Sequence, residues 1–400
     1  MNGPVAITPA KMVTLGVGWF GFEIFWAFHS GPMPLFLRDF TDSKFNISLV
    51  LSLAGLAGCI VPSAVGYLSD RSASRFGRRR PFIFLGFLGV LLCLLGFPRV
   101  TSFGMVALLS GWMYFSLRFA ETPYLSLLPD IAPPEQRSTA SGVMHLIGTL
   151  GLIGCFLMSS ALWDAHPNAV FLLVAFGSFG FVLLAVVLIQ EPSVEREVSV
   201  ATTGPLAYLR SIAEETVALR FFAAQFFWWL GFWMVSSFST LFVVEELQVS
   251  EGDSFLVLAV FSVVAALFML PLGMLGDRFG RKGVLSALIA AWAASQIVIG
   301  FSQNLTHALL TVGISAVPFA GAMAVGLAYM LDLVPRNRTA EFVGFSVISV
   351  AVAQIVGPMI GGKLIDLIGY RSIFPAAAAS MIVGLIVLQF VSARPRRTGA

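Results

Sequence analysis

The chain has 400 residues, of which 58% are hydrophobic and only 11% are charged, and its formal net charge is +3. Its mean hydropathy is +0.89. A soluble domain carries roughly 25% charged residues. This chain therefore has too little polar surface to cover a water-soluble globule, and we expect the remaining surface to face the lipid bilayer.

Apolar stretches of about 20 residues recur along the chain, and this is the length that an α-helix needs to span a bilayer. The short alternating segments of a transmembrane β-barrel are absent from the sequence. The first apolar stretch is too long for a cleavable signal peptide. The sequence predicts an all-α polytopic membrane protein, and its twelve expected transmembrane helices cover residues 13–37, 47–68, 81–98, 104–129, 139–162, 169–190, 219–243, 254–274, 283–301, 306–332, 340–363 and 373–393.

Lysine and arginine residues are distributed unevenly between the predicted loops. If the N-terminus lies inside the cell, most of them fall on the cytoplasmic side, and the outer side holds only Arg38, Lys44, Arg99, Lys363 and Arg371. Cytoplasmic loops are enriched in these residues. We therefore expect both termini in the cytoplasm and the protein in the inner (plasma) membrane. The positive charge reflects this topology and gives no support for a nucleic-acid partner.

Two polar motifs each occur twice, in the same order and at nearly the same spacing. The first follows the second predicted helix as Gly66-Tyr-Leu-Ser-Asp70-Arg71 and the eighth as Gly273-Met-Leu-Gly-Asp277-Arg278. The second runs from Asp130 to Arg137 after the fourth helix and from Asp332 to Arg338 after the tenth. This pattern is typical of parallel repeats related by an axis along the membrane normal. The expected domains are an N-terminal six-helix bundle (1–190), a cytoplasmic linker (191–218) and a C-terminal six-helix bundle (219–400).

The segment from Gly66 to Ile83 resembles the loop signature of the major facilitator superfamily. Within it, the run RFGRRRPFI, which starts at Arg75, is similar to the sucrose/proton symporters of the glycoside–cation symporter group, and so is the run ETPYLSLLPD, which starts at Glu121. The general resemblance spans the chain, whereas the sugar-specific part is limited to its first half. The resemblance implies the major facilitator fold and alternating access, with proton-coupled symport of a sucrose- or maltose-like glycoside.

Alternating access requires the two halves to associate and separate on the cytoplasmic side. We interpret the repeated loops as a conformational latch, in which ion pairs form and break and glycines let helix ends approach closely. A simpler interpretation is that the arginines only fix the topology. The expected latch residues are Gly66, Asp70, Arg71, Arg75, Gly77, Arg78, Asp130, Arg137, Gly273, Asp277, Arg278, Gly280, Arg281, Asp332 and Arg338.

Four ionisable residues lie inside predicted helices of the first half, namely Glu23, Arg118, Glu121 and His145. A charge near the bilayer centre costs about 2.5–3.5 kcal/mol on insertion scales, so such residues are expected to be functional. Arg118 and Glu121 are three residues apart and therefore share one helix face. The resemblance to major facilitator proteins places Glu23 close to this pair.

We expect these four residues to form a proton-coupling centre. In the sucrose symporters an acidic residue on the fourth helix serves coupling, and Glu121 is the matching position. Sodium-coupled melibiose-type members also carry acidic residues on the second helix, but the stretch 47–68 contains none here. Protons are therefore favoured over sodium. Two simpler interpretations remain open, a static Arg118–Glu121 pair and a His145 that only bonds to a backbone carbonyl.

Tryptophans accompany these acids at helical spacing. Trp19, Glu23 and Trp26 share one face of the first predicted helix. Sugars stack their apolar faces on indole rings while carboxylates bind their hydroxyls, so the expected substrate-binding residues are Trp19, Glu23, Trp26, Gln225, Trp229 and Trp233. Tryptophan is also common at membrane interfaces, and simple packing is the alternative.

The remaining chemistry-bearing residues give little indication of catalysis. Cys59, Cys93 and Cys155 lie in predicted helices and suggest neither a disulfide framework nor a metal site. No nucleophile–base motif or phosphate loop is present in the sequence. We expect a monomer without enzymatic activity, metal or cofactor, whose partners are lipid, protons and a small-molecule solute. The alternatives are a carrier for another organic solute, in uptake or efflux, and a receptor or assembly factor that does not transport.

Overall fold

The computed structural model describes residues 7–72, 74, 76–189, 191, 215–334 and 339–391. Within these ranges the chain is helical and contains no strand, which confirms the predicted all-α fold. Of the predicted linker, 191–218, only residues 191 and 215–218 fall inside the described ranges.

The first half of the chain forms a bundle of long helices with one short helix. Its elements are α1 (Pro9–Ser30), α2 (Pro32–Arg38), α3 (Lys44–Arg71), α4 (Arg80–Gly96), α5 (Phe103–Ile131), α6 (Arg137–Leu162) and α7 (Pro167–Leu188). The second half repeats this order as α9 (Thr216–Ser236), α10 (Ser239–Leu241), a π-helical turn (Phe242–Glu246), α11 (Glu251–Phe279), α12 (Arg281–Gly300), α13 (Leu305–Leu333), α14 (Thr339–Ile368) and α15 (Ile373–Gln389).

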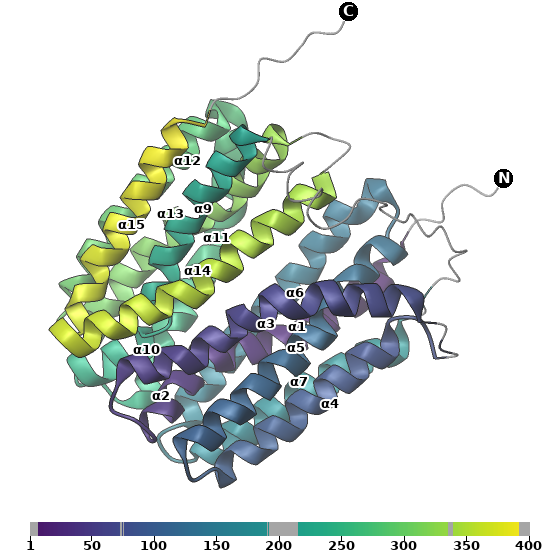
Figure 1. The fold of residues 1–400 in the computed structure, drawn as a ribbon, viewed down its shortest axis with the longest axis horizontal. Coiled ribbons are helices and arrows are strands. Elements are labelled where there is room, and N and C mark those ends of the chain that lie inside the picture. Colours follow the sequence, from purple (N-terminus) through teal and green to yellow (C-terminus); the bar gives the residue numbers. More distant parts are fainter. Residues whose placement is uncertain are drawn as a thin grey trace, which may run out of the picture.

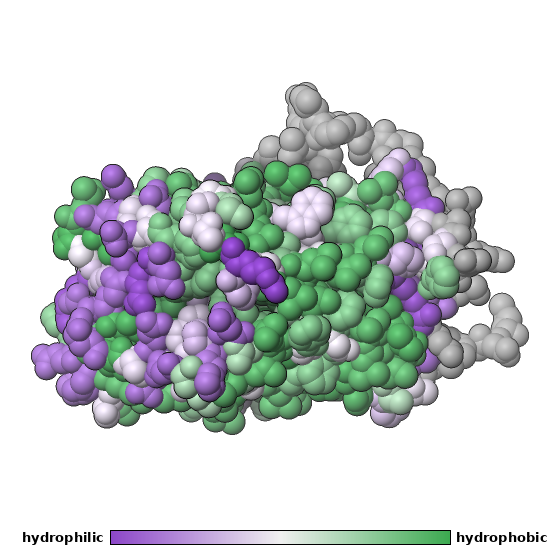
Figure 2. Space-filling model, turned by 90° about the horizontal axis from the view of Figure 1, so that it is seen from below, coloured by the Kyte–Doolittle hydropathy of each residue, from purple (hydrophilic) through white to green (hydrophobic). Residues whose placement is uncertain are grey.

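Eleven helices in the described part of the chain are long and apolar enough to cross a membrane. The twelfth predicted span, α1, has 22 residues, which at about 1.5 Å per residue is also a spanning length. It packs along both α6 and α7 within the first half. Figure 2 shows the result at the surface, a broad apolar band between two hydrophilic ends.

Two predicted helices, 13–37 and 219–243, are interrupted at corresponding places. The prediction that each is continuous was therefore wrong. α1 ends before Gly31, because Pro32 and Pro34 lack the N–H groups that a continuous helix needs. α9 ends before Ser237, and α10 and the π-helical turn follow. The two breaks meet across the halves, since the hydroxyl of Thr240 donates a hydrogen bond of 3.4 Å to the carbonyl of Gly31.

The two halves lie side by side and contact each other mainly through α3 against α14 and α6 against α11. Figure 1 shows that they diverge toward the side on which α1 begins and α15 ends. We call this side the terminal end, and the side that carries α2 and α10 the opposite end. The largest cluster of buried apolar side chains includes Phe238, Phe242 and Phe255 of the second half together with the core of the first half. The halves therefore share a core near the opposite end.

Candidate transport site

The site begins with one face of α1. Trp19 is buried, while Glu23 and Trp26 are partly buried. Gly148 of α6 packs directly against this face, because a Cβ atom added there would collide with the indole of Trp19 and lie 3.0 Å from Cγ of Glu23. Close approach of α6 thus fixes the positions of both side chains.

Glu121 lies in the second half of α5 and is only 6% exposed. Its Oε2 accepts a hydrogen bond of 2.5 Å from Nη1 of Arg118, and its Oε1 accepts one of 3.2 Å from Nε1 of Trp26. The guanidinium of Arg118 lies over the Trp26 ring, 4.8 Å from its centroid. A carboxylate, a guanidinium and an indole therefore form one unit between α1 and α5. Glu23 lies within electrostatic reach of the Glu121 carboxyl group.

A buried histidine and tyrosine, which were not among the predicted site residues, extend this unit. Nδ1 of His29 lies 2.7 Å from the hydroxyl of Tyr114. The His29 ring stands edge-on to Trp26 at a centroid distance of 5.4 Å. His29 is one helical turn from Trp26, and Tyr114 is one turn from Arg118. This spacing was the available signal, because both pairs place their members on the same helix faces.

His145 of α6 lies beside Trp19. The two rings are perpendicular, with centroids 5.4 Å apart. In the described part of the chain no hydrogen bond or ion pair joins His145 to Glu121 or Arg118. The structure therefore brings Arg118, Glu121 and Trp26 into direct contact, and it places His145 on the Trp19 side of the site.

The corresponding region of the second half is aromatic and uncharged. Trp229 and Trp233 of α9 stack with centroids 6.3 Å apart. Gln225 accepts a hydrogen bond of 2.9 Å from the hydroxyl of Ser346 on α14. The ionisable residues of the described parts of α9 to α15 lie near helix ends. The buried charges that the sequence placed in the first half thus have no counterpart in the described core of the second.

At the terminal end of the first half, three predicted latch residues, Asp70, Arg78 and Asp130, form ion pairs, two of which involve Arg79, a residue outside the predicted latch. Arg79 binds Asp70 at 3.0 Å and Asp130 at 2.5 Å, and Arg78 binds Asp130 at 2.9 Å. Glu191 accepts hydrogen bonds from the backbone N–H groups of residues 78, 79 and 80. Gly77 has a φ of 108°, which glycine adopts without strain. None of these contacts involves a residue of the second half.

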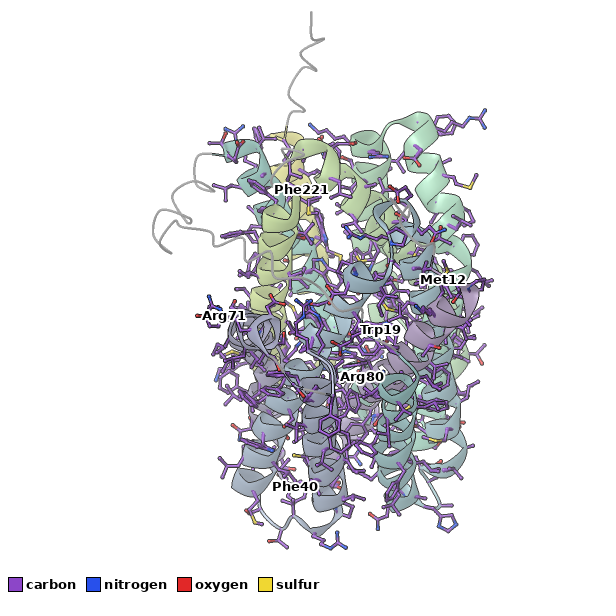
Figure 3. The ribbon with its side chains drawn as sticks, turned by 90° about the vertical axis from the view of Figure 1, so that its right-hand side faces the viewer. Met12, Trp19, Phe40, Arg71, Arg80 and Phe221 are labelled. Carbon is purple, nitrogen blue, oxygen red and sulfur yellow. The ribbon has the colours of Figure 1, made fainter. Side chains whose placement is uncertain are left out.

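Other predicted latch residues of this half contact neighbouring groups. Arg71 lies over the Tyr67 ring, 3.6 Å from its centroid, and Arg137 donates to the carbonyls of Ala132 and Pro129 at the end of α5. A Cβ at Gly66 would lie 4.0 Å from Thr122. Arg75 lies outside the described residues. In Figure 3, Arg71 and Arg80 are seen below Phe221 of the second half.

The second half repeats the arrangement. Arg281 binds Asp277 at 2.8 Å and Asp332 at 2.9 Å. Gly280, which precedes α12, has a φ of 93°. Arg278 lies over the ring of Phe279 at 5.3 Å, and Gly273 faces Ala324. Arg338 lies outside the described residues. The sequence repeat is thus matched by a structural one, with an aspartate from each motif bound to the same arginine.

At the opposite end, ion pairs join the two halves, and the sequence analysis assigned these residues no role. Arg38 binds Glu251 at 2.5 Å, and Trp163 donates to the same carboxylate at 2.6 Å. Lys44 binds Glu245 at 2.9 Å. Burial raises the pKa of the neighbouring Asp39 carboxyl group above its ordinary value, although Arg38 lowers it.

Asp366 of α14 also crosses between the halves. Its carboxylate accepts hydrogen bonds from the Ser43 hydroxyl and from the N–H groups of Lys44 and Phe45, at 2.7, 2.7 and 3.0 Å. These groups form the start of α3, where a negative charge is favoured by the helix dipole. Gly362 allows this approach, because its Cβ would lie 2.5 Å from the Lys44 carbonyl oxygen.

The fold and the repeated loops agree with a comparison to known families. The chain matches the Major Facilitator Superfamily over residues 15–255 and 221–400, which together span nearly its whole length. The chain belongs to the major facilitator superfamily. Its long apolar helices agree with this assignment, and it is an integral membrane protein.

Several curated relatives match part of the chain. The multidrug resistance protein MdtG of Proteus mirabilis is 31% identical over 168 residues, which cover 40% of each protein. The inner membrane transport protein YajR of Escherichia coli is 28% identical over 40% of this chain and 35% of its own length. Human solute carrier family 45 member 3 is 29% identical over 35% of this chain and 28% of its own length. The matches thus span less than half of these relatives.

Solved structures agree in fold along almost the whole chain. A mutant of the nucleoside transporter NupG superposes with a TM-score of 0.79 and covers 95% of this chain and 99% of its own, at 14% identity. A bacterial homologue of the human lysosomal transporter Spinster, in an inward-facing and occupied conformation, has a TM-score of 0.78, covers 97% of both chains and is also 14% identical. At this identity the likeness concerns the fold alone.

Proposed function

We propose that this transporter is a proton-coupled symporter of an uncharged glycoside, such as a sucrose- or maltose-like sugar. The observation that carries the proposal is the buried Arg118–Glu121 pair, whose carboxylate also binds Trp26. Ionisable residues at membrane depth are costly. Replacing a buried ion pair by apolar residues is often neutral or stabilising, so helix packing alone gives little reason for this pair.

Glu121 is suited to couple proton binding to movement. A proton on its carboxylate would remove the charge that holds both Arg118 and the N–H of Trp26. Because Arg118 and Glu121 belong to α5 and Trp26 to α1, this change alters a contact between two helices. Glu23 is a second carboxyl group within electrostatic reach, and His145 lies beyond Trp19. We assign coupling to Glu121, with Glu23 and His145 as further proton carriers.

The aromatic residues on both halves support a ring-shaped solute. Trp19 and Trp26 lie next to the acids of the first half, and Trp229 and Trp233 stack in the second. An indole offers a flat apolar face and a single N–H donor. These groups suit the apolar face and hydroxyl oxygens of a sugar ring.

The distribution of ion pairs supports an inward-facing state with the terminal end in the cytoplasm. At the opposite end, Arg38 and Lys44 bind carboxylates of the other half. At the terminal end, the ion pairs in the described ranges each lie within one half. In this account each latch aspartate is bound by an arginine of its own half until the terminal end closes.

The proposed halves, 1–190 and 219–400, would move as two bodies about this closed end. The contacts of α3 with α14 and of α6 with α11 are the surfaces on which they would tilt. Loss of the ion pairs at the opposite end would open the site to the other side of the membrane. A single membrane-inserted chain carries the whole path, so the proposal requires only a monomer.

Export of an amphipathic organic compound is the second candidate. Relatives of this chain include the multidrug resistance protein MdtG and a class H tetracycline resistance protein. Within the second half, Phe232, Phe319 and Trp292 pack against one another, which supports an apolar lining. In that case the same buried acids would exchange a proton for the exported compound.

Uptake by purified protein in proteoliposomes tests the proposal. A panel of radiolabelled sugars, including sucrose and maltose, is supplied with and without an inward proton gradient. We expect the gradient to raise accumulation of at least one sugar by tenfold or more above equilibrium, since about 1.4 kcal/mol corresponds to a tenfold ratio. If the gradient changes the uptake of no sugar in the panel, symport is rejected. Gradient-driven exchange of tetracycline in the same vesicles would instead favour export.

A further inference from the structure

The guanidinium of Arg118 is held between α1 and α3. It lies over the Trp26 ring, 4.8 Å from the ring centroid. It also contacts Gly58 of α3, because a Cβ atom added there would lie 3.3 Å from Nη2 and 3.4 Å from Nε of Arg118. The absence of a side chain at position 58 therefore lets the guanidinium rest directly against the backbone of α3.

Only part of the hydrogen-bonding capacity of Arg118 is used in this state. Nη1 donates to Glu121, whereas Nε is buried and has no hydrogen-bond partner within the described ranges. A guanidinium has five N–H donors, and buried donors without partners are rare in folded proteins. Nε and Nη2 are the two nitrogens nearest to Gly58, so an acceptor at this residue lies on their side of the guanidinium.

The backbone of α3 provides such an acceptor. Pro62 lies inside this helix and has no N–H, so it cannot donate the helical hydrogen bond to the carbonyl four residues earlier, which belongs to Gly58. Carbonyl groups freed by a proline in a transmembrane helix are satisfied by neighbouring helices, side chains or water. In the described chain Arg118 donates to Glu121 and not to this carbonyl. The acceptor therefore lies beside a guanidinium that has an unused donor.

The same stretch of α3 is tightly fitted against the second half. The hydroxyl of Ser52 donates a hydrogen bond of 2.8 Å to the carbonyl of Ile355 on α14. A Cβ at Gly55 would lie 2.8 Å from the carbonyl oxygen of Ala351, also on α14. Both contacts are within about 9 Å of Gly58 along the helix axis. A guanidinium that shifts against this part of α3 therefore acts on a helix that contacts the other half.

We propose that Arg118 has two alternative partners, the charged Glu121 carboxylate and, once Glu121 carries a proton, the Gly58 carbonyl. A proton binds to the carboxylate, the hydrogen bond from Nη1 is lost, and Nε or Nη2 turns to the Gly58 carbonyl, so the positive charge keeps an acceptor. Gly58 and Pro62 are positioning residues, since they act through Arg118. The inference rests on the proposed role of Glu121 in proton coupling and adds how the proton changes a contact of α3.

Other titratable groups surround this pair and have to be separated from Glu121 in a test. Those on α1, α3, α5 and α6 are Glu23, His29, Cys59, Tyr114, Tyr124 and His145. α4 also packs on α5, and its titratable residues, Arg80 and Cys93, lie near its two ends.

Selective isotope labels can report on the Gly58 carbonyl in the full chain. Two glycines precede a cysteine in the sequence, Gly58 before Cys59 and Gly154 before Cys155. Protein with ¹³C at the glycine carbonyls and ¹⁵N in the cysteines therefore gives two signals in an HNCO spectrum, recorded in lipid nanodiscs without solute. Gly154 is the internal control, because a Cβ there meets no atom within 4 Å.

The Gly58 carbonyl signal should move downfield with a single midpoint as the pH is lowered, because the guanidinium binds to it, and the Gly154 signal should stay in place. Glu121→Gln lacks the charge at every pH, so its Gly58 signal should remain at the low-pH position. Pro62→Ala restores the helical N–H, so its Gly58 signal should no longer titrate. Glu23→Gln should keep a titration.

His145→Gln should also keep the titration of the Gly58 signal. A titration that is lost in Glu23→Gln or His145→Gln and kept in Glu121→Gln would assign the response to another acid or base and would overturn the proposal.

The same contact predicts the direction of an effect on transport. The second partner stabilises the protonated state, so its loss makes protonation of Glu121 harder. One hydrogen bond to a charged group corresponds to at least about a tenfold change. Pro62→Ala should therefore move the midpoint of pH-dependent exchange about one pH unit lower. The exchange is measured in proteoliposomes with the transported compound among sucrose, maltose and tetracycline.

Two further variants make the transport measurement specific. Gly58→Ala should move the midpoint in the same direction, because its methyl group crowds the turned guanidinium more than the paired one. Pro271→Ala is the matched control in α11, since it restores an N–H to the carbonyl of Leu267, an exposed residue of the apolar surface. It should leave the midpoint unchanged.

The possible results separate this proposal from the proposed function. If the Gly58 signal responds neither to pH nor to Glu121→Gln, or moves together with the Gly154 signal, the second partner is rejected, even if Pro62→Ala fails to fold. Rejection also follows if Pro271→Ala shifts the midpoint as much as Pro62→Ala. A Gly58 titration that is lost in Glu121→Gln, in a protein whose transport ignores protons, would support the contact and refute the coupling. Proton-coupled uptake with an unresponsive Gly58 signal would support the function and refute the contact.

Discussion

The two halves of the molecule share one backbone plan and differ in their buried chemistry. Each has its first long helix interrupted, at Gly31 and at Ser237, and each binds two loop aspartates through an arginine. Trp26 and Trp233 occupy similar places before the two breaks. The indole N–H of Trp26 donates to Glu121, whereas that of Trp233 is buried without a partner in the described ranges.

This difference shows that the two halves share close helix packing but do not share the buried charged residues. Glycines that allow close helix approach recur, since a Cβ at Gly148 would collide with Trp19 and one at Gly357 would lie 3.0 Å from Cβ of Trp233. The carboxylates occur in the core of the first half only, as far as the structure describes it. We infer that the two halves have different roles. The first half binds the proton, and the second contributes neutral contacts to the solute.

The largest expected effect comes from removing the central carboxylate. Glu121→Gln should abolish proton-driven accumulation, a loss of at least tenfold, because the side chain can no longer gain or lose a proton. Exchange of solute across the membrane without a gradient should remain measurable, since Gln keeps the size and polarity of Glu. Proteoliposome uptake and counterflow measure the two activities separately.

A matched control for this change is available in the second half. Glu246→Gln removes a carboxylate that pairs with Arg371 at the opposite end, and it should leave accumulation near the wild-type level. Accumulation that persists in Glu121→Gln would show that Glu121 is not the coupling acid and would move the assignment to Glu23. Equal loss in both variants would contradict the difference between the halves.

The shared packing predicts similar effects of two glycine substitutions. Gly148→Ala and Gly357→Ala should each lower the free energy of unfolding by about 1–3 kcal/mol, because the added methyl group overpacks a tight helix contact. Gly154→Ala is the control on α6, since a Cβ there meets no atom within 4 Å. Thermal unfolding in detergent compares the three proteins. A loss at Gly148 without a loss at Gly357 would show that the packing is not shared.

The ends of the molecule can be compared in the same way. Asp366→Ala removes a carboxylate that accepts three hydrogen bonds across the halves. A hydrogen bond to a charged group contributes about 1.5–3 kcal/mol, so loss of even one of the three should raise the population open at the opposite end by at least about tenfold. Asp253→Ala, which removes an exposed acid of α11, should have no effect.

Distances between spin labels can report this shift. Labels at Asp42→Cys and His307→Cys, both exposed at the opposite end and in different halves, would be introduced after replacement of Cys59, Cys93 and Cys155. Pulsed electron–electron double resonance should show that a longer distance between the labels becomes more populated in Asp366→Ala. An unchanged distribution would mean that this contact does not hold the opposite end closed.

The smallest effect is expected for the buried pair beside Trp26. His29→Gln and Tyr114→Phe should each lower proton-driven accumulation about two- to fivefold, since each removes one hydrogen bond that helps to position Trp26. The double variant should be no worse than either single variant, because both changes break the same contact. His307→Gln is the control. Fully additive losses would indicate that the two residues act independently of each other.

Local patterns in the sequence were sufficient for most of the helices and for the central ion pair. Arg118 and Glu121 are three residues apart, so helical geometry alone brings them together. The interruption at Gly31 was also signalled by Pro32 and Pro34, although the prediction extended the helix to residue 37. The interruption at Ser237 has no such signal, since no proline is nearby.

Contacts between distant residues could not be predicted in this way. Arg38 and Glu251 are 213 residues apart, and Ser43 and Asp366 are 323 apart. Their pairing depends on how the two halves tilt, which no local pattern encodes. The contact of His29 with Tyr114 likewise requires the relative rotation of α1 and α5. Local sequence patterns predict which charged residues share a helix face. Which of these residues contact each other across helices depends on how the helices pack.

Simultaneous recording of proton and solute movement tests the central claim most directly. Proteoliposomes that contain a pH-sensitive dye are supplied with a transported glycoside, without an imposed gradient, and internal pH and radiolabelled solute are followed together. We expect that solute entering the wild-type vesicles acidifies the interior in fixed proportion, and that Glu121→Gln takes up solute without acidification. Solute uptake by the wild-type protein without proton movement, or equal acidification by Glu121→Gln, would contradict it.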